Sequence, residues 1–129
     1  MELIADTNIF LAVVLNEPSK KRIIELTTEV TLIAPEILPY EIGNALSAMV
    51  KRRKITIEEA LTAEYEASLI PVRLINLDVH AALQLALDHN IYAYDAYFLH
   101  CAQSSSRPLL TLDRRMKQVA NELSIRILE

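Results

Sequence analysis

The sequence predicts a three-layer α/β/α protein, in which a central parallel sheet of about five short strands lies between helices. Short apolar runs alternate with helical segments along all 129 residues. Two of these runs end in an aspartate, Asp6 or Asp113, at which a helix begins. The length, with 52% hydrophobic and 23% charged residues, fits one globular domain over residues 1–129.

Each expected element has its own signal in the sequence. Pro35 and Pro71 close the segments before them, Thr56 and Glu59 have the spacing of a capping box, and Asp78 suits the start of a helix. Strands are expected where apolar residues run together or alternate, at 2–5, 31–34, 72–77, 109–112 and 125–127. Helices are expected where apolar residues fill a longer segment or recur at helical spacing, at 7–15, 20–29, 36–53, 56–69, 78–89, 94–104 and 114–123.

The composition excludes several classes of protein. With a single cysteine, Cys101, the chain cannot form an internal disulfide or a cysteine-ligated metal site. With a single glycine, Gly43, it has no glycine-rich loop for a nucleotide cofactor. No signal peptide or membrane-spanning run is recognisable, so we expect a cytoplasmic protein with no membrane partner. The formal net charge of −4 means that a nucleic acid would need local positive charge or a bound cation.

The acidic residues are the strongest functional signal. Because the carboxyl ends of parallel strands meet at one edge of a sheet, Asp6 and Asp113 are expected to lie close together. Each also suits the N-cap of the helix that follows, as Asp95 does, and Glu41 suits a solvated flank of its helix. Two carboxylates about 4 Å apart repel each other by about 4 kcal/mol at an effective dielectric constant near 20, so such a cluster takes up protons or binds a cation. Oxygen ligands alone favour Mg²⁺ or Mn²⁺, and such a cation is suited to the cleavage of phosphodiesters.

Four short segments give these acids a recognisable context. They are, in chain order, Asp6-Thr7-Asn8, Glu41 with Asn44, Tyr94-Asp95-Ala96, and Thr111 with Asp113. In this order, and over the whole chain, they resemble the motifs of a PIN-domain ribonuclease, specifically a VapC-type toxin of a type II toxin–antitoxin system.

The resemblance implies an endoribonuclease that depends on Mg²⁺ or Mn²⁺. Asp6 and Asp95 would be the most direct metal ligands, and Glu41 and Asp113 would complete the acidic pocket through water or a second cation. The resemblance also implies hydrogen bonds to the ligands from a second set of side chains: Thr7, Asn8, Asn44 and Thr111. It implies an RNA substrate, a homodimer and a VapB-like antitoxin.

Several assignments remain open at the level of sequence. The run from Lys51 to Lys54 suits RNA phosphates or the end of a helix, and Arg114 and Arg115, beside Asp113, are candidates for RNA contact. The aromatic residues at 92–98 suit base stacking, although core or dimer packing is favoured.

The alternatives to a toxin are a catalytically silent PIN-like interaction module and an RNA-processing PIN nuclease without an antitoxin. A haloacid-type phosphatase is disfavoured because Asn8 stands where it needs a second aspartate.

Overall fold

The computed structural model describes all 129 residues and contains a four-stranded parallel sheet with seven helices. The strands lie in the order β3-β2-β1-β4, so the first strand is central. The elements are β1 (Glu2–Ala5), α1 (Thr7–Val14), α2 (Lys20–Thr27), β2 (Thr31–Pro35), α3 (Leu38–Lys51), α4 (Ile57–Ser68), β3 (Arg73–Ile75), α5 (Val79–His89), α6 (Ala93–Ser105), β4 (Leu109–Leu110) and α7 (Arg114–Glu122). The predicted α/β fold is confirmed.

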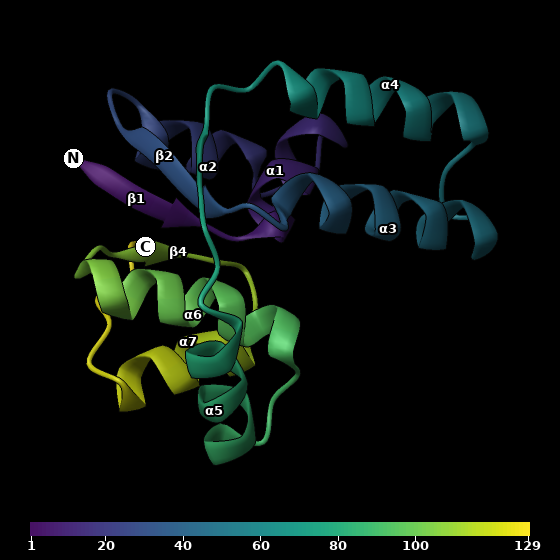
Figure 1. Cartoon of the computed structure of the whole chain (residues 1–129). Helices are drawn as coiled ribbons and strands as arrows, with labels where there is room; N and C mark the ends of the chain where they lie inside the picture. Colours follow the sequence, from purple (N-terminus) through teal and green to yellow (C-terminus); the bar gives the residue numbers. More distant parts are fainter.

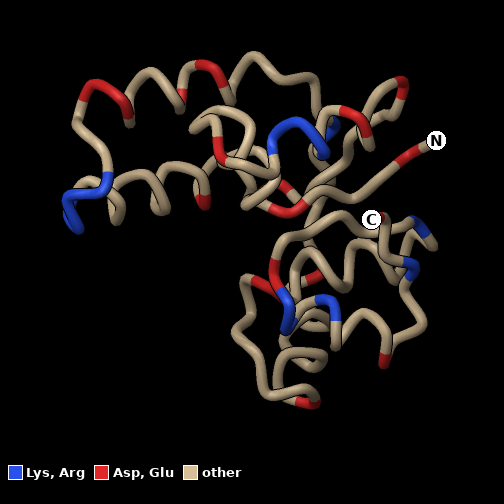
Figure 2. Tube along the Cα trace, turned by 180° about the vertical axis from the view of Figure 1, so that it is seen from behind, with Lys and Arg blue, Asp and Glu red and all other residues tan.

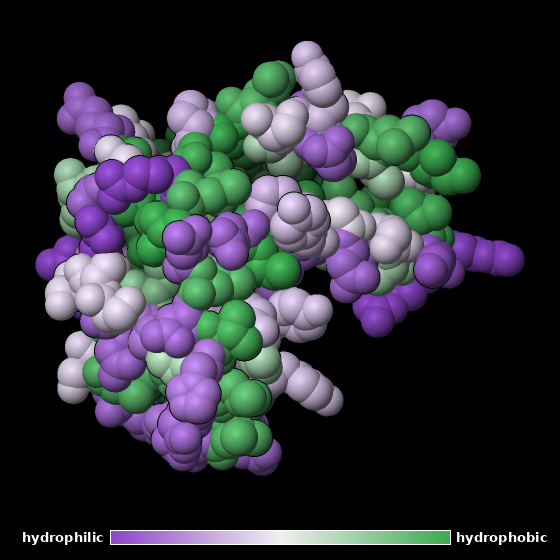
Figure 3. Space-filling view, in the orientation of Figure 1, coloured by the Kyte–Doolittle hydropathy of each residue, from purple (hydrophilic) through white to green (hydrophobic).

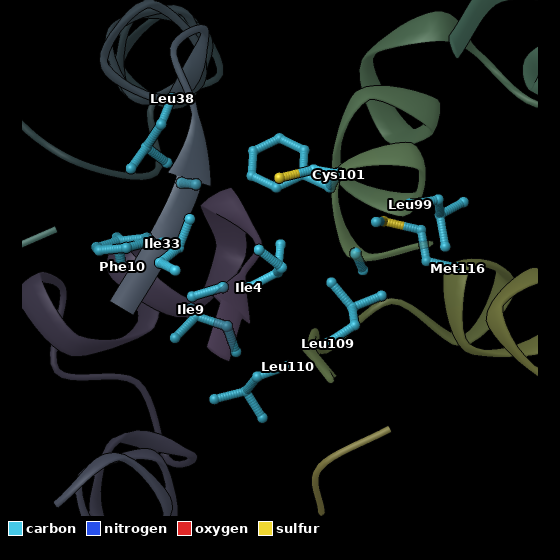
Figure 4. Close-up of a cluster of buried hydrophobic side chains, with 14 of the residues drawn as sticks. Ile4, Ile9, Phe10, Ile33, Leu38, Leu99, Cys101, Leu109, Leu110 and Met116 are labelled. Carbon is cyan, nitrogen blue, oxygen red and sulfur yellow. The ribbon is translucent and has the colours of Figure 1, made fainter. Parts of the chain in front are cut away.

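Helices cover the sheet on two sides. Helices α1 to α4 gather on one side and α5 to α7 on the other (Figure 1). The central strand β1 is therefore buried on both faces, as its apolar run after Glu2 suggests; Leu3 and Ile4 are fully buried. Figure 4 shows Phe10 and Leu38 packed on one side of these strands and Leu99 and Met116 on the other.

The fifth expected strand is reduced to a single bridge. Ile127 pairs in parallel with Leu109, and two backbone hydrogen bonds hold the C-terminal segment there, Leu109 N to Arg126 O and Leu128 N to Leu109 O. The strand β4 is also shorter than expected. It stops at Leu110, opposite Ala5, the last residue of β1; beyond it two backbone N–H groups bond to side chains, that of Leu112 to Asn8 Oδ1 and that of Asp113 to Thr111 Oγ1.

Most turns in this chain are made without glycine. Six residues have positive φ angles, and none of them is a glycine. Asn90 and Ser106 end α5 and α6 in the left-handed conformation, with φ of 53° at both. The other four are Asn16, Glu29, Arg53 and Ser124.

The two edges of the sheet differ in charge. At the beginning of β1, Glu2 accepts hydrogen bonds from Arg73 (2.8 Å) and Arg107 (2.8 and 3.1 Å). These bonds and charges, with Arg107 contributing most, lower the pKa of Glu2. At the carboxyl ends of the strands, where helices begin, acidic residues dominate. None of the helices is long and apolar enough to span a bilayer.

Candidate functional site

All four predicted acids lie at the carboxyl edge of the sheet. Asp6 directly follows β1 and caps α1, and Asp113 caps α7 just after β4. Glu41 lies in the first turn of α3 and Asp95 in the first turn of α6. The tube view shows acidic segments at the junction between the two groups of helices (Figure 2).

Asp6 is held by hydrogen bonds to both of its carboxylate oxygens. Its Oδ1 accepts from the backbone N–H of Thr7 (2.8 Å), which begins α1, and its Oδ2 accepts from the hydroxyl of Thr111 (2.7 Å). The side chain is only 6% exposed. The same carboxylate therefore caps α1 and belongs to the acidic group. The hydrogen bond that begins the helix also helps to fix the orientation of the acid.

Thr111 connects three of the predicted residues. Its buried hydroxyl donates to Asp6, accepts from the backbone N–H of Asp113 (3.1 Å), and lies 3.4 Å from the amide nitrogen of Asn8. Asp113 Oδ1 in turn accepts from the N–H of Met116 (2.9 Å). The Thr111 hydroxyl thus fixes both Asp6, which follows β1, and the turn that carries Asp113, which follows β4.

Glu41 is linked to the same network through Thr7. The Thr7 hydroxyl donates to Glu41 Oε2 at 2.9 Å, which joins α1 to α3. The other oxygen of this carboxylate, Oε1, is buried and has no hydrogen-bond partner. A buried oxygen of this kind is costly to leave unpaired, and it is available to a proton or a cation.

Burial and mutual repulsion raise the pKa values of three of the acids. Burial is the largest cause at each. It raises the pKa of Asp6 to about 6 and that of Glu41 to about 7, against the opposing hydrogen bonds from Thr111 and Thr7. The charge of Asp95 raises both values further, and the pKa of Asp95 itself is raised by burial and by Asp113. The acids therefore interact with one another although they come from four different helices.

In chemistry these acids suit a hard divalent cation. Every donor is a carboxylate oxygen, and Glu41 Oε1 is buried without a partner. No three Asp, Glu, His or Cys side chains in the chain converge closely enough to form a complete metal cage. The structure thus brings the expected ligands into one electrostatic group, and their coordination of a metal stays a prediction.

Two of the predicted residues have contacts that the sequence did not indicate. The Asn44 side chain is exposed and forms no hydrogen bond with the acids; its backbone carbonyl accepts one from the Ser47 hydroxyl. Arg115 donates to the carbonyl of His89 (2.8 Å), so it is tied to the end of α5. Arg114 is exposed and makes no such contact, which leaves it as the freer of the two arginines.

The basic run from Lys51 to Lys54 is remote from the acids. It lies at the outer tip of the α3–α4 hairpin, away from the junction where the acids gather (Figure 2). Lys51 is in the last turn of α3, where a positive charge complements the helix dipole.

A cavity that sequence reasoning missed adjoins Glu41. Its volume is about 270 Å³, and its lining includes Thr7, Tyr40, Glu41, Asn44 and Tyr94. The space-filling view is hollowed on this side, between the helices of the two groups (Figure 3). The sequence did not single out Tyr40, because one tyrosine on a helix forms no recognisable pattern. The one feature that could have indicated it is its position directly before a predicted site acid, which Tyr94 shares.

Comparisons with known proteins agree with this architecture. The family model described as "PIN domain" matches residues 3–122. The crystal structure of VapBC2 from Rickettsia felis, bound to a DNA fragment from their promoter, contains a chain that is similar with a TM-score of 0.68 and 19% identity; the match covers 100% of this chain and 98% of that one. PAE2754 from Pyrobaculum aerophilum is similar with a TM-score of 0.66 and 18% identity, covering 96% and 90%. A search of curated proteins gave no match. With nearly its whole length matched by the family model, the chain belongs to the PIN domain family.

Proposed function

We propose that this protein is a metal-dependent endoribonuclease, with Mg²⁺ or Mn²⁺ as its cofactor. PIN domains are generally nucleases, and the chain belongs to that family. The observation that carries the proposal is the group of carboxylates at the carboxyl edge of the sheet, where burial and repulsion raise the pKa values of Asp6, Glu41 and Asp95. Such a group gains most from a cation, because the cation removes the repulsion.

The roles that we propose follow the contacts of each side chain. Asp6 and Asp95 would hold the cation most directly, with Glu41 and Asp113 around them. When bound, the cation would supply the positive charge that stabilises a phosphodiester during cleavage. Thr7 and Thr111 orient the carboxylates by the hydrogen bonds described above, and Asn8 supports Thr111.

Arg114 is our candidate for a phosphate contact near the acids. It is exposed and directly follows Asp113, whereas Arg115 is held by the His89 carbonyl. A guanidinium group in that position would offset part of the negative potential of the site for an RNA backbone.

A toxin role with an antitoxin partner and a homodimeric state are further parts of the proposal. The similarity to a chain of the VapBC2 complex supports them at the level of fold. The exposed face of α4 supports a protein partner: Ile57, Leu61 and Tyr65, four residues apart, are 64%, 68% and 63% exposed. A cytoplasmic location fits the absence of any helix able to span a bilayer, and it stays part of the proposal.

Cleavage of a mixed RNA pool tests the activity. We expect cutting with Mg²⁺ or Mn²⁺ and none in EDTA. Asp6→Asn and Asp95→Asn should each reduce the rate to about 1% or less, since each removes a proposed ligand. The matched control is Asp88→Asn, because Asp88 is exposed on α5 and bonds only to Gln84.

Two outcomes would contradict the nuclease proposal, and a third would contradict the toxin role. Undiminished cutting by Asp6→Asn or Asp95→Asn would show that these acids do not hold an essential metal. Failure of the parent protein to cut RNA, together with no heat of Mg²⁺ or Mn²⁺ binding in calorimetry, would favour the catalytically silent interaction module. Cutting by a protein that binds no VapB-like protein would favour the RNA-processing nuclease.

A further inference from the structure

Two exposed tyrosines line the cavity beside Glu41. The Tyr40 side chain is 73% exposed and that of Tyr94 is 58% exposed, and both contribute to the cavity wall. Tyr40 comes from α3 and Tyr94 from α6, so the two rings reach the same cavity from helices on opposite sides of the sheet. Because Glu41 lines the same cavity, a group held by the rings lies next to this site acid.

The ring of Tyr94 is held in a defined orientation. It meets the ring of Tyr97 edge to face, with centroids 5.9 Å apart and an angle of 83° between the planes. Tyr97 is partly buried and lies one turn further along α6. One ring therefore anchors the other, and the exposed ring loses little freedom when a planar group stacks on it.

The rest of the cavity wall combines Ile37 and Ala45 with the polar residues Thr7, Glu41 and Asn44. Asn44 contributes an exposed amide that forms no hydrogen bond within the chain. Glu41 contributes a carboxylate whose Oε1 is buried and unpaired, and Thr7 holds the other oxygen. The cavity thus combines aromatic faces with donors and acceptors, at about 270 Å³.

We propose that this cavity binds one unpaired nucleobase, which stacks on Tyr94 and Tyr40 and presents its polar edge to Asn44. The inference rests on the proposed nuclease function and deepens it, since it makes Tyr40 and Tyr94 specificity-determining residues. Bases in a duplex have both faces covered by their neighbours, so only an unpaired base can enter.

A nucleobase suits the cavity better than a side chain from a second protein copy. Its flat face can stack on the rings, and its edge carries N–H groups and acceptors that can pair with the exposed Asn44 amide. An aliphatic side chain would cover the rings but offer no hydrogen bond to that amide.

Binding in the absence of metal separates stacking from cleavage. The probe is a short single-stranded RNA with one 2-aminopurine, whose fluorescence falls when the base stacks, titrated with the protein in EDTA. We expect quenching with the parent protein and about tenfold weaker binding with Tyr94→Leu or Tyr40→Leu, as is typical for the loss of one stacking partner. Tyr94→Phe keeps the ring and should bind as the parent does.

The matched control is Tyr92→Leu. Tyr92 is 84% exposed and lies at the start of α6, as Tyr94 does, but it does not line the cavity. This variant should bind as tightly as the parent protein. A fully paired RNA duplex with the same 2-aminopurine should show no quenching.

The outcomes distinguish this inference from the nuclease proposal. Equal affinity of Tyr94→Leu, Tyr40→Leu and the parent protein would overturn it, even if the parent cuts RNA with Mg²⁺. Absence of quenching with the parent protein would also overturn it. Quenching that depends on the two tyrosines in a protein that cuts no RNA would support the base site and reject the nuclease. A lower oligomeric mass of Tyr94→Leu with unchanged quenching would assign the ring to a protein interface instead.

Discussion

At Asp6 one carboxylate begins a helix and belongs to the acidic group. The helix requires only an oxygen that accepts a hydrogen bond, and the amide of asparagine would supply it equally well. The negative charge is unfavourable at this buried position, where burial and the charges of Asp95 and Asp113 raise the pKa to about 6. The charge therefore has no use in folding.

The stability of the metal-free protein should depend on this charge. An acid whose pKa is higher in the folded than in the unfolded state favours folding at low pH, and this contribution is lost as the pH rises from about 4 to about 6. We expect the free energy of unfolding in EDTA to fall by roughly 1 kcal/mol between pH 5 and pH 7.5 because of Asp6. In Asp6→Asn that part of the fall should disappear, and at pH 7.5 the variant should be about 1 to 2 kcal/mol more stable.

Urea unfolding of both proteins at the two pH values measures the effect. Asp88→Asn, which changes an exposed acid of α5, should behave as the parent protein does. The same pH dependence in the parent protein and in Asp6→Asn would show that Asp6 is not buried in a costly charged state.

Much of the site was predictable from single residues, and the rest depended on contacts in space. Asp6 and Asp113 were readable because each follows an apolar strand and precedes a helix. Glu41 needed the family resemblance, since a glutamate on a helix flank has no pattern of its own. Three features depend on packing between segments that are distant in the chain, which cannot be read from the sequence alone. They are the hydrogen bond from Thr7 to Glu41, the bond from Arg115 to the His89 carbonyl and the cavity at Tyr40.

At the scale of elements, the helix ends show how the chain turns with a single glycine. Left-handed backbone costs a residue with a Cβ about 1 kcal/mol or more, and glycine avoids this cost. In the loop after α3, Arg53 has a φ of 58°, whereas its neighbour Arg52, which caps the helix, has a φ of −84°. Two arginines in adjacent positions thus have φ angles of opposite sign.

This pair provides a matched test of the turn. Arg53→Gly should increase the free energy of unfolding relative to Arg52→Gly by about 1 kcal/mol, because only the first substitution relieves a strained φ. Both variants remove one charge from the same basic run, so electrostatic effects cancel in the comparison. Thermal or urea unfolding gives the difference, and equal stability of the two variants would contradict the strained turn.

The element boundaries show where sequence reasoning stops. All seven helices were predicted, because helical spacing and caps are local signals. The last strand was predicted as a full element but exists as one bridge at Ile127. Alternating apolar residues indicate a buried face, and they do not determine how many backbone groups find a partner. Likewise, β4 stops opposite the end of β1, and beyond it side chains of the site bond to the N–H groups of Leu112 and Asp113.

At the scale of the whole molecule, the acids lie where the two groups of helices meet. Asp6 and Glu41 belong to the group of α1 to α4, and Asp95 and Asp113 belong to α6 and α7. A cation held between these carboxylates would connect both groups and would bind only to the folded chain. Ligands that bind only the folded state raise its stability in proportion to the logarithm of their concentration.

Saturating Mg²⁺ or Mn²⁺ should therefore raise the Tm by about 5 °C at pH 7.5. Calorimetry or circular dichroism with increasing metal measures the shift. Asp88→Asn should show the full rise, and Asp6→Asn should show little or none. A rise of the same size in Asp6→Asn would mean that the metal acts elsewhere on the surface.

The unpaired oxygen of Glu41 and the buried charge of Asp6 also have a consequence for which substitutions the chain tolerates. Replacing either acid by its amide, Asp6→Asn or Glu41→Gln, would relieve the repulsion between the carboxylates while keeping almost the same side-chain shape. A lineage with no use for the charges would drift toward the more stable amide forms. The carboxylates of Asp6 and Glu41 are thus the less stable choice at their positions unless a proton or a cation neutralises them.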